Sequence, residues 1–219
     1  MRLNKRTRSI LLSGMIGVMT LSTAFPALAA TGWTTAGDKQ YYYYNDGQMA
    51  KGLVTIDNIY YYFNEDGSLW KGWLQIGEDY YYMQSSNGAL STGWVQIGSD
   101  WYYMLPESGK CVLNTAMEIE GSWYFFKSDG KRLGGWLKKD DAFYYMDPAD
   151  SGRMVAGITK NIGGVNYTFA ANGVCASAVQ VTDYYTAVTA SAADTTQNST
   201  QTEDDNYGKT NVIVAGERR

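Results

Sequence analysis

The side chains that could do chemistry in this sequence are its aromatic rings, which gather in short blocks along the chain. A typical block is Trp101-Tyr102-Tyr103-Met104, and a Gly-Trp pair, here Gly93-Trp94, precedes it. Ring faces are electron-rich, so several together can surround a quaternary ammonium, each ring contributing about 0.5–2 kcal/mol. The same platform can stack against the apolar face of a sugar. The blocks therefore indicate a binding surface and leave its ligand open.

Catalytic chemistry has much less support. The chain contains no histidine, which removes Ser-His and Cys-His arrangements and most zinc sites. The acidic pairs Glu65-Asp66 and Asp140-Asp141 fall in polar turn regions, where solvation should keep them from acting as the paired carboxyls of a glycosidase. We expect a protein that is not an enzyme, with no catalytic residue, no metal and no cofactor.

The spacing of the blocks follows from an internal repeat of roughly 20 residues. The stretch GWLQIGEDYYYMQSSNGALSTG, from Gly72 to Gly93, shows the template: Gly-Trp, an alternating run, a turn, an aromatic block and a second turn that ends in glycine. The repeat region covers residues 31–178. Its seven repeats are predicted at 32–51, 52–71, 72–92, 93–113, 114–134, 135–156 and 157–178.

Each repeat carries the signals of a β-hairpin, because aromatic and β-branched residues lie between clusters of Gly, Asn, Asp and Ser. No long 3.6-residue apolar period interrupts this pattern. A lone hairpin is barely stable in water, so the repeats must stack to build a continuous core. We therefore predict an all-β fold, a solenoid or superhelix of stacked β-hairpins with one hairpin per repeat. Alternate aromatics along a strand point to opposite faces, so only half of each block can serve the core.

The two cysteines test this fold. Cys111 and Cys175 each lie two residues after a turn glycine, a position that Met49, Leu69 and Leu90 fill in other repeats. An even number of cysteines in an exported protein could form a disulfide. Equivalent positions three repeats apart, however, should hold the Cα atoms well beyond the bridging limit of about 7 Å. We predict two reduced, buried thiols.

The two ends of the chain differ from the repeats. Residues 1–30 combine a basic start, an apolar stretch from Ile10 to Leu21 and small residues up to Ala29 and Ala30. This pattern predicts a secretory signal peptide, cleaved after Ala29 or Ala30, and no membrane span after cleavage. Residues 179–219 are rich in Thr, Ser, Ala, Gln and Asp and predict a flexible C-terminal tail. The formal net charge of −4 argues against nucleic acid as a partner.

The order Gly-Trp, short spacer, Gly, Trp-Tyr-Tyr-Phe/Met, turn glycine and apolar residue resembles the cell-wall-binding repeat. That repeat occurs in choline-binding modules of surface proteins, in glucan-binding domains of glucosyltransferases and in receptor-binding domains of large clostridial toxins. The resemblance covers roughly residues 32–178. It implies a superhelix of hairpins, left-handed in the choline-binding members, with ligand sites between consecutive hairpins. It also implies a secreted protein of the cell surface or cell wall, whose partner is choline-bearing teichoic acid or a polysaccharide.

In the choline-binding relatives, a site resembles a box of the Gly-Trp tryptophan and aromatics from the hairpins on either side. Carried over to this sequence, the resemblance groups Trp73 with Tyr60 and Tyr80. It also groups Trp94 with Tyr80 and Trp101, and Trp136 with Trp123 and Phe143. The candidate ligand-binding residues are therefore Tyr60, Trp73, Tyr80, Trp94, Trp101, Trp123, Trp136 and Phe143.

The box pattern fails at several junctions. Leu53, Thr115 and Ile158 replace the tryptophan, and Asn166 replaces the first aromatic, so these junctions are expected to be weak or empty. Trp33, at the N-terminal end, has no preceding hairpin. For each single aromatic, packing between hairpins is as good an explanation as ligand binding, because aromatics dominate core packing as readily as sites.

These observations lead to one main hypothesis and two alternatives. The first is an exported, non-catalytic protein that attaches to the bacterial cell envelope through aromatic sites between hairpins, with a choline-bearing wall polymer as ligand. The second is recognition of a glucan or another surface glycan, and the third is a structural or adhesive module without a small-molecule site. Partial loss of the boxes favours the second and third over a strict choline binder. The number of working sites and the oligomeric state stay open.

Overall fold

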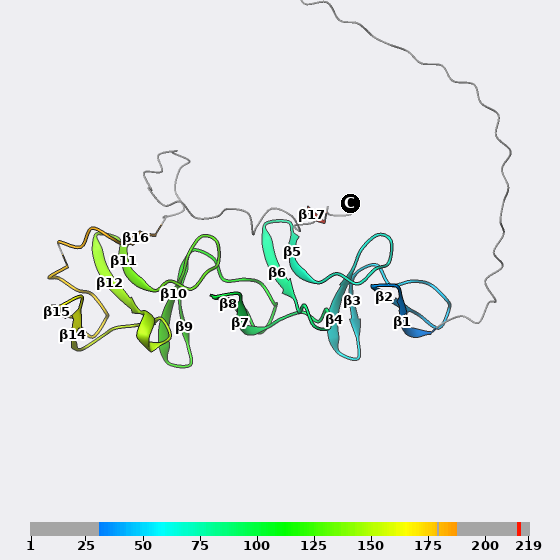
Figure 1. The fold of residues 1–219 in the computed structure, drawn as a ribbon, viewed down its shortest axis with the longest axis horizontal. Helices are drawn as coiled ribbons and strands as arrows, with labels where there is room; N and C mark the ends of the chain where they lie inside the picture. The colour runs from blue at the N-terminus through cyan, green and yellow to red at the C-terminus, as the bar shows by residue number, and fades with distance from the viewer. Residues whose placement is uncertain (1–30, 179, 188–213, 216–219) are drawn as a thin grey trace, which may run out of the picture.

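A chain of β-hairpins makes up nearly all of the computed structural model, which describes residues 31–178, 180–187 and 214–215 (Figure 1). The predicted signal peptide and most of the predicted tail lie outside the described residues. The structure confirms the predicted all-β fold, with one hairpin in each repeat. The hairpins are β1 (Gly32–Ala36) with β2 (Lys39–Tyr43), β3 (Gly52–Ile56) with β4 (Ile59–Phe63), β5 (Gly72–Ile76) with β6 (Asp79–Met83), β7 (Gly93–Ile97) with β8 (Asp100–Met104), β9 (Thr115–Ile119) with β10 (Ser122–Phe126), β11 (Gly135–Lys139) with β12 (Ala142–Asp147), and β14 (Thr159–Ile162) with β15 (Val165–Thr168).

Turn chemistry explains why each hairpin closes in two residues. The φ angle is positive at both Asp57 (50°) and Asn58 (64°), as a type I′ turn requires. In the β5–β6 turn, positive φ occurs at Gly77 (62°) and is not found at Glu78, which fits a type II′ turn with glycine in first position. These turn types match the right-handed twist of the strands, so local sequence alone sets the hairpins.

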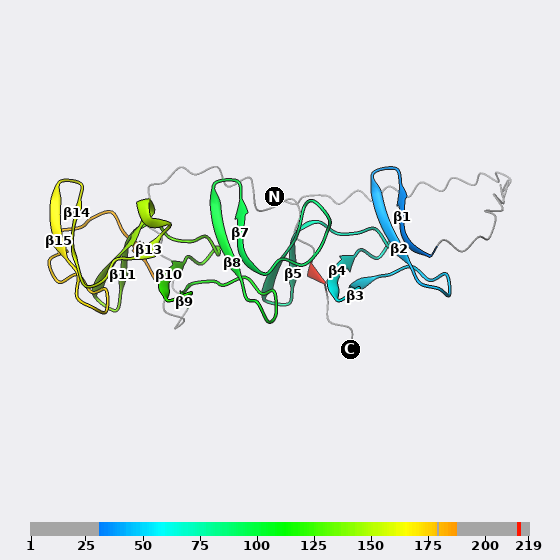
Figure 2. The ribbon, with the colours of Figure 1, turned by 90° about the horizontal axis from the view of Figure 1, so that it is seen from below.

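Successive hairpins stack in a row and rotate relative to one another. In Figure 2 the hairpins β1–β2, β7–β8 and β14–β15 point to the same side. In Figure 1 the hairpins β3–β4 and β9–β10 point one way, and β5–β6 and β11–β12 point the other way. Hairpins three apart in sequence therefore share a direction, and the repeats form an elongated superhelix.

A recurring backbone hydrogen bond joins consecutive hairpins at five junctions of the described structure. Its donor is the residue two places after the turn glycine, which we call the slot residue. Cys111 N–H, for example, donates to the carbonyl oxygen of Tyr80 on the preceding hairpin, at 2.7 Å. The same bond forms between Leu90 and Tyr60, at 2.8 Å. The slot residues of the seven repeats are Met49, Leu69, Leu90, Cys111, Arg132, Met154 and Cys175.

The core runs along the row of hairpins as a series of connected clusters. The last residue of each aromatic block lies at its centre, with Met83, Met104 and Phe126 all 0% exposed. Burying a side chain of this size contributes about 1.5–3 kcal/mol. Phe126 packs with Trp94 of the preceding hairpin as well as with its own, so the core depends on stacking, as the repeat model requires.

The sequence pattern places the first aromatic block at residues 41–44, and the strand register moves it by one residue. Trp33 is the cross-strand partner of Tyr42, just as Trp73 is the partner of Tyr82. The first aromatic block therefore begins at Gln40 and not at a tyrosine. The box at Trp33 has a glutamine where other boxes have their first aromatic.

The fifth and seventh repeats are also shifted by one residue. Ala116 and Thr159 lie across from the third residue of their blocks, in the tryptophan position. The repeat pattern in the sequence predicts Thr115 and Ile158 at this position. The reason is that repeat length and first-strand length vary by one residue, which counting from the expected repeat start does not detect.

Three short strands and one helical turn complete the described structure. The 3₁₀-helix η1 (Pro148–Asp150) leads into β13 (Arg153–Met154), which pairs with β12. Strand β16 (Tyr185–Thr186) runs parallel to β11, and β17 (Val214–Ala215) runs parallel to β5. No helix in the described residues is long and apolar enough to cross a membrane.

Strand β16 lies in the region whose composition predicted a flexible tail. The Tyr185 ring packs 5.8 Å from the Phe125 ring, centroid to centroid. Its hydroxyl oxygen accepts a hydrogen bond from Ser128 N–H at 3.0 Å. Two adjacent aromatics, Tyr184 and Tyr185, thus dock this segment onto the last hairpins despite its polar surroundings.

Candidate functional site at the aromatic junctions

Rings from two consecutive hairpins meet around Trp73. Trp73 on β5 lies across from Tyr82 on β6, with ring centroids 5.4 Å apart and planes at 69°. Tyr102, on β8 of the following hairpin, reaches the same indole at 4.9 Å and 72°. The tryptophan is half-buried and Tyr102 is buried. We call this group of three rings the Trp73 box.

The same arrangement recurs at three other tryptophans, where each indole contacts the third aromatic of its own block and the second of the next. The tryptophan-to-tyrosine centroid distances lie between 4.8 and 5.4 Å. These boxes are Trp33 with Tyr42 and Tyr61, Trp94 with Tyr103 and Tyr124, and Trp136 with Tyr145 and Tyr167. Strand alternation contributes, since the tryptophan and its cross-strand tyrosine share one face of their hairpin, and the second aromatic of the next block lies on the opposite face of its own hairpin from the third.

Two of the groupings carried over from the relatives do bring rings together. Trp94 and Trp101 lie 6.3 Å apart at 82°, and Trp136 and Phe143 lie 6.5 Å apart at 85°. Both are contacts within one hairpin. In these two repeats, the first aromatic of the block therefore joins the box of its own tryptophan.

The groupings across hairpins differ from the expectation, because each tryptophan faces the following hairpin and not the preceding one. The expected pairs across hairpins that make no ring contact in the described part of the chain are Trp73–Tyr60, Trp94–Tyr80 and Trp136–Trp123. Trp73 and Tyr80, which share a hairpin, make no ring contact there either. The sequence reasoning missed the second aromatic of each following block. Strand alternation gives part of this signal, because it places the second aromatic of a block on the opposite face of its hairpin from the first and third.

The candidates Tyr60 and Trp123 lie at junctions without a tryptophan in the box position. Tyr60 is 50% exposed and Trp123 is 45% exposed, and neither makes a ring contact within the described residues. Leu53, which replaces the tryptophan beside Tyr60, is itself 52% exposed. These two junctions carry single surface aromatics and no box.

The N-terminal box is better formed than the sequence suggested. Trp33 contacts Phe63 of the following hairpin at 5.8 Å, in addition to its two tyrosines. The absence of a preceding hairpin does not matter, because boxes form toward the following one. Trp33 is still 42% exposed, since Gln40 leaves one side of the indole without a ring.

The boxes differ in the charges that lie against them. The guanidinium carbon of Arg132 lies 5.8 Å from the ring centroids of both Trp94 and Trp101. Near the Trp136 box, Lys138 Nζ lies 5.8 Å from the ring of Phe143, and Tyr184 packs edge-on against the same ring at 5.3 Å. Among the described residues, no such cation lies over the rings of the Trp73 box.

The side chains of the Trp73 box and the Cys111 thiol beside it are uncharged. Desolvation is the main cause that raises the pKa of the Tyr102 phenol, and the Asp100 and Asp129 carboxylates raise it further. Burial likewise raises the pKa of the Cys111 thiol to about 12. Both cysteines are free and buried, which confirms the predicted reduced thiols. Neither group carries charge near neutral pH, so uncharged side chains form this box.

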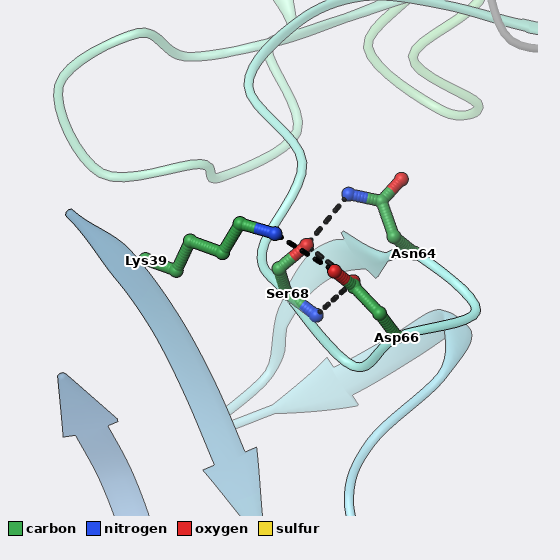
Figure 3. Close-up of polar contacts among 4 residues, drawn as sticks. All are labelled: Lys39, Asn64, Asp66 and Ser68. Atoms are coloured by element: carbon green, nitrogen blue, oxygen red, sulfur yellow. Dashed lines mark hydrogen bonds and ion pairs between the residues drawn. The ribbon is translucent and has the colours of Figure 1, made fainter. Parts of the chain in front are cut away.

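The acidic turn residues have structural partners. Figure 3 shows Asp66, one of the paired carboxylates considered above, which accepts hydrogen bonds from Ser68 N–H at 2.9 Å and from the Ser68 hydroxyl at 2.5 Å. Asn64 Nδ2 donates to the Ser68 hydroxyl oxygen at 2.9 Å. Lys39 of the preceding hairpin donates to Asp66 at 2.9 Å. Comparable ion pairs between neighbouring hairpins are Lys110–Asp79 at 2.6 Å and Lys131–Asp100 at 3.2 Å.

Two family models match the repeat region. One, described as a choline-binding repeat, matches residues 30–71, 50–92 and 113–157. The other, described as a putative cell wall binding repeat, matches residues 92–110. A search of curated proteins gave no match.

Solved structures show the same fold. CbpJ from Streptococcus pneumoniae TIGR4 is 28% identical over 67% of this chain and 52% of that chain, with a TM-score of 0.62. Choline binding protein F from Streptococcus pneumoniae, in the presence of a peptidoglycan analogue, is 28% identical over 67% of this chain and 46% of that chain, with a TM-score of 0.58. CbpF in complex with ipratropium is 26% identical over 67% and 48%, with a TM-score of 0.57. The chain thus spans about half the length of these structures.

Proposed function

The chain belongs to the choline-binding repeat family, and we propose that it is a non-catalytic binding protein of the bacterial cell envelope. In this proposal it is exported and holds the quaternary ammonium groups of a choline-bearing wall polymer in aromatic boxes between its hairpins. The signal peptide predicted from residues 1–30 supports export. The repeat chemistry supports attachment at the cell wall or surface.

The observation that carries the proposal is the Trp73 box. The rings of Tyr82 and Tyr102 lie 5.4 and 4.9 Å from the Trp73 ring, centroid to centroid, so rings from three strands meet there. No cation of the described residues lies over these rings. A quaternary ammonium has no hydrogen to donate, so ring faces are its natural partners. Three rings sum to about 1.5–6 kcal/mol, a range that includes the roughly 4 kcal/mol of a millimolar complex. Many weak boxes on one polymer then give avidity.

The relatives' ligands point the same way. The structure of CbpF holds ipratropium, a compound whose charged group is a quaternary ammonium. Another CbpF structure was solved in the presence of a peptidoglycan analogue, a tetrasaccharide-pentapeptide. These ligands belong to that protein. For this chain they favour a quaternary ammonium as the ligand group and a wall polymer as its carrier.

The direct test is a calorimetric titration of the full chain with choline, compared between two variants. Trp73→Ala removes the indole at the centre of the box and should lower choline affinity at least tenfold or remove one binding site. Leu53→Ala is the matched control, because Leu53 occupies the same position in the preceding repeat without forming a box. Circular dichroism should show that both variants keep their β-structure.

Two outcomes would contradict the proposal. Choline binding that Trp73→Ala leaves unchanged would assign the box to packing alone. A chain that shows no saturable choline response but binds soluble glucan would instead support the glycan alternative. Trp73→Phe keeps a smaller ring in the box and should retain part of the choline affinity. It provides a second test of the box if the alanine variant does not fold.

A further inference from the structure

Arg132 departs from the chemistry of the other slot residues. Met, Leu or Cys fills this position in the remaining six repeats. The backbone of Arg132 behaves as in the other repeats, because its N–H donates to the Trp101 carbonyl oxygen at 2.7 Å. Its stem also packs like the others, with Nε 2.6 Å from a Cβ built on Gly152 of the next repeat. The fold thus places an arginine where an uncharged side chain is the rule.

The head of this side chain lies on the Trp94 box. The guanidinium carbon is 5.8 Å from the Trp94 centroid and 5.8 Å from the Trp101 centroid, and these two rings stand at 82° to each other. A cation within about 6 Å of both centroids occupies the region where a ligand ammonium would contact them. The box is therefore filled from within the chain.

The partners of this guanidinium in the described residues are the aromatic side chains of the box. Its side chain forms no hydrogen bond or ion pair there, and it interacts with the two indoles and, electrostatically, with the Tyr124 phenol of the same box. Arg132 is half-buried, and this desolvation lowers its pKa, although it stays charged at neutral pH. A guanidinium is weakly hydrated and stacks well on aromatic faces, so the indoles are favourable partners for it.

The Trp73 box provides the contrast within the same protein. Its slot residue is Cys111, which makes the same backbone bond, to Tyr80. The thiol is short, neutral and buried, and it brings no charge to the rings. The two neighbouring boxes also differ in their first aromatic, Trp101 in one and Tyr80 in the other, but only the slot residue of the Trp94 box, an arginine where the other box has a cysteine, brings a charge to the rings.

We infer that Arg132 is a specificity-determining residue that occupies the Trp94 box as an intramolecular cation and closes it to quaternary ammonium ligands. Two cations cannot share the same ring faces without like-charge repulsion and loss of the arginine contacts. The Trp73 box is then an open site beside a closed one. This inference rests on the proposed function, because it assumes that an open box takes choline.

The test is calorimetry of choline binding to the full chain with Arg132→Ala. The variant should bind one more choline per chain than the wild type, and adding Trp94→Ala should remove that extra site. Arg132→Lys keeps a cation in place and should leave the stoichiometry at the wild-type value. Leu90→Ala shortens the slot residue at a junction without a box and should add no site. Arg132→Cys introduces the slot residue of the Trp73 box. It should also add one choline site, and it replaces Arg132→Ala in the test if the alanine variant does not fold.

The outcomes separate this inference from the proposed function. If choline binding depends on Trp73 but folded Arg132→Ala and Arg132→Cys add no site, the proposed function stands and the inference is overturned. If Arg132→Ala instead weakens choline or phosphocholine binding, Arg132 belongs to a site and does not close one. If neither the wild type nor Arg132→Ala binds choline, both the proposed function and the inference fail.

Discussion

A Cβ atom placed on Gly88 would lie 2.7 Å from Cδ2 of Leu69, the slot residue of the preceding repeat. The same contact recurs between Gly109 and Leu90, also at 2.7 Å. Gly88 in addition has a φ of +76°, a region that side chains with a Cβ rarely adopt. Two features therefore require glycine at this turn. Its backbone has a positive φ, and a Cβ atom would collide with the slot side chain of the preceding repeat.

Gly88→Ala should destabilise the protein by about 2–5 kcal/mol, from about 1–2 kcal/mol for the left-handed backbone and about 1–3 kcal/mol for overpacking against Leu69. Gly47→Ala is the control, because Gly47 has a φ of +81° but no atom within 4 Å of its Cβ position. It should lose only the backbone part. Urea unfolding followed by circular dichroism measures both. If both variants lose the same free energy of unfolding, the contact between position 88 and Leu69 does not contribute to the destabilisation.

The free cysteines predict a clear chemical result. Cys111 and Cys175 are buried, and burial raises the pKa of the Cys111 thiol to about 12, so little thiolate forms near neutral pH. Neither thiol should react with iodoacetamide in the folded protein, and both should react in denaturant. Intact-mass spectrometry counts the modified thiols. A disulfide, or rapid modification of the native chain, would contradict the stacking that keeps the two cysteines apart.

The hairpins could be predicted from the sequence because their determinants are local. Turn residues such as Asp57-Asn58 and Gly77 set the type of each turn, and the aromatic blocks set the strands. The exact register could not be read in the same way. Ala116 stands in the box position in place of the expected Thr115, because repeats differ in length by one residue and side-chain direction in a strand inverts with every shift of one.

The partners of each tryptophan depend on the rotation between hairpins, which no local pattern encodes. Alternation places Trp73 and Tyr82 on one face, but only stacking decides that Tyr102 of the following hairpin covers it. The role of Arg132 escaped prediction for the same reason. Its ring partners Trp94 and Trp101 lie on the preceding hairpin. The residues at the slot position of the first three repeats, Met49, Leu69 and Leu90, are all apolar and give no sign of a charged residue there.

The acid stability of the first junction should depend on Asp66. Hydrogen bonds from the Ser68 hydroxyl and from Lys39 hold the pKa of this carboxyl well below its ordinary value. Because the folded pKa lies below the unfolded one, the stabilisation is present above about pH 4 and is lost as the pH falls further. Asp66→Asn should flatten the fall of the thermal midpoint below about pH 4. The group is exposed, so the effect should be small and weaken in salt.

The control for this experiment is Asp46→Asn. Asp46 occupies the equivalent turn position in the first repeat and accepts a hydrogen bond from Gln48 N–H at 3.0 Å, but no ion pair of the described residues joins it to another hairpin. If the thermal midpoint depends on pH in the same way in Asp66→Asn and in the wild type, the Asp66 carboxylate does not contribute to acid stability.

The alkaline limit of the fold should come from buried tyrosines. Burial is the leading cause that raises the pKa of Tyr62, Tyr81, Tyr102 and Tyr145. A folded pKa above the unfolded value of about 10 means that their contribution to stability is intact below that pH and is lost as the pH rises beyond it. Tyrosinate absorbance should therefore rise in two stages, the second together with loss of the circular-dichroism signal of the folded state.

Tyr102→Phe removes one of these phenols while keeping the ring in the Trp73 box. The variant should hold its folded signal to a higher pH than the wild type, because one fewer proton is released on unfolding. Tyr60→Phe, at a position that is 50% exposed, serves as the matched control. If all tyrosines ionise in a single stage while the β-structure remains intact, the buried phenols are accessible to solvent and the packing described for Tyr102 at the junction is incorrect.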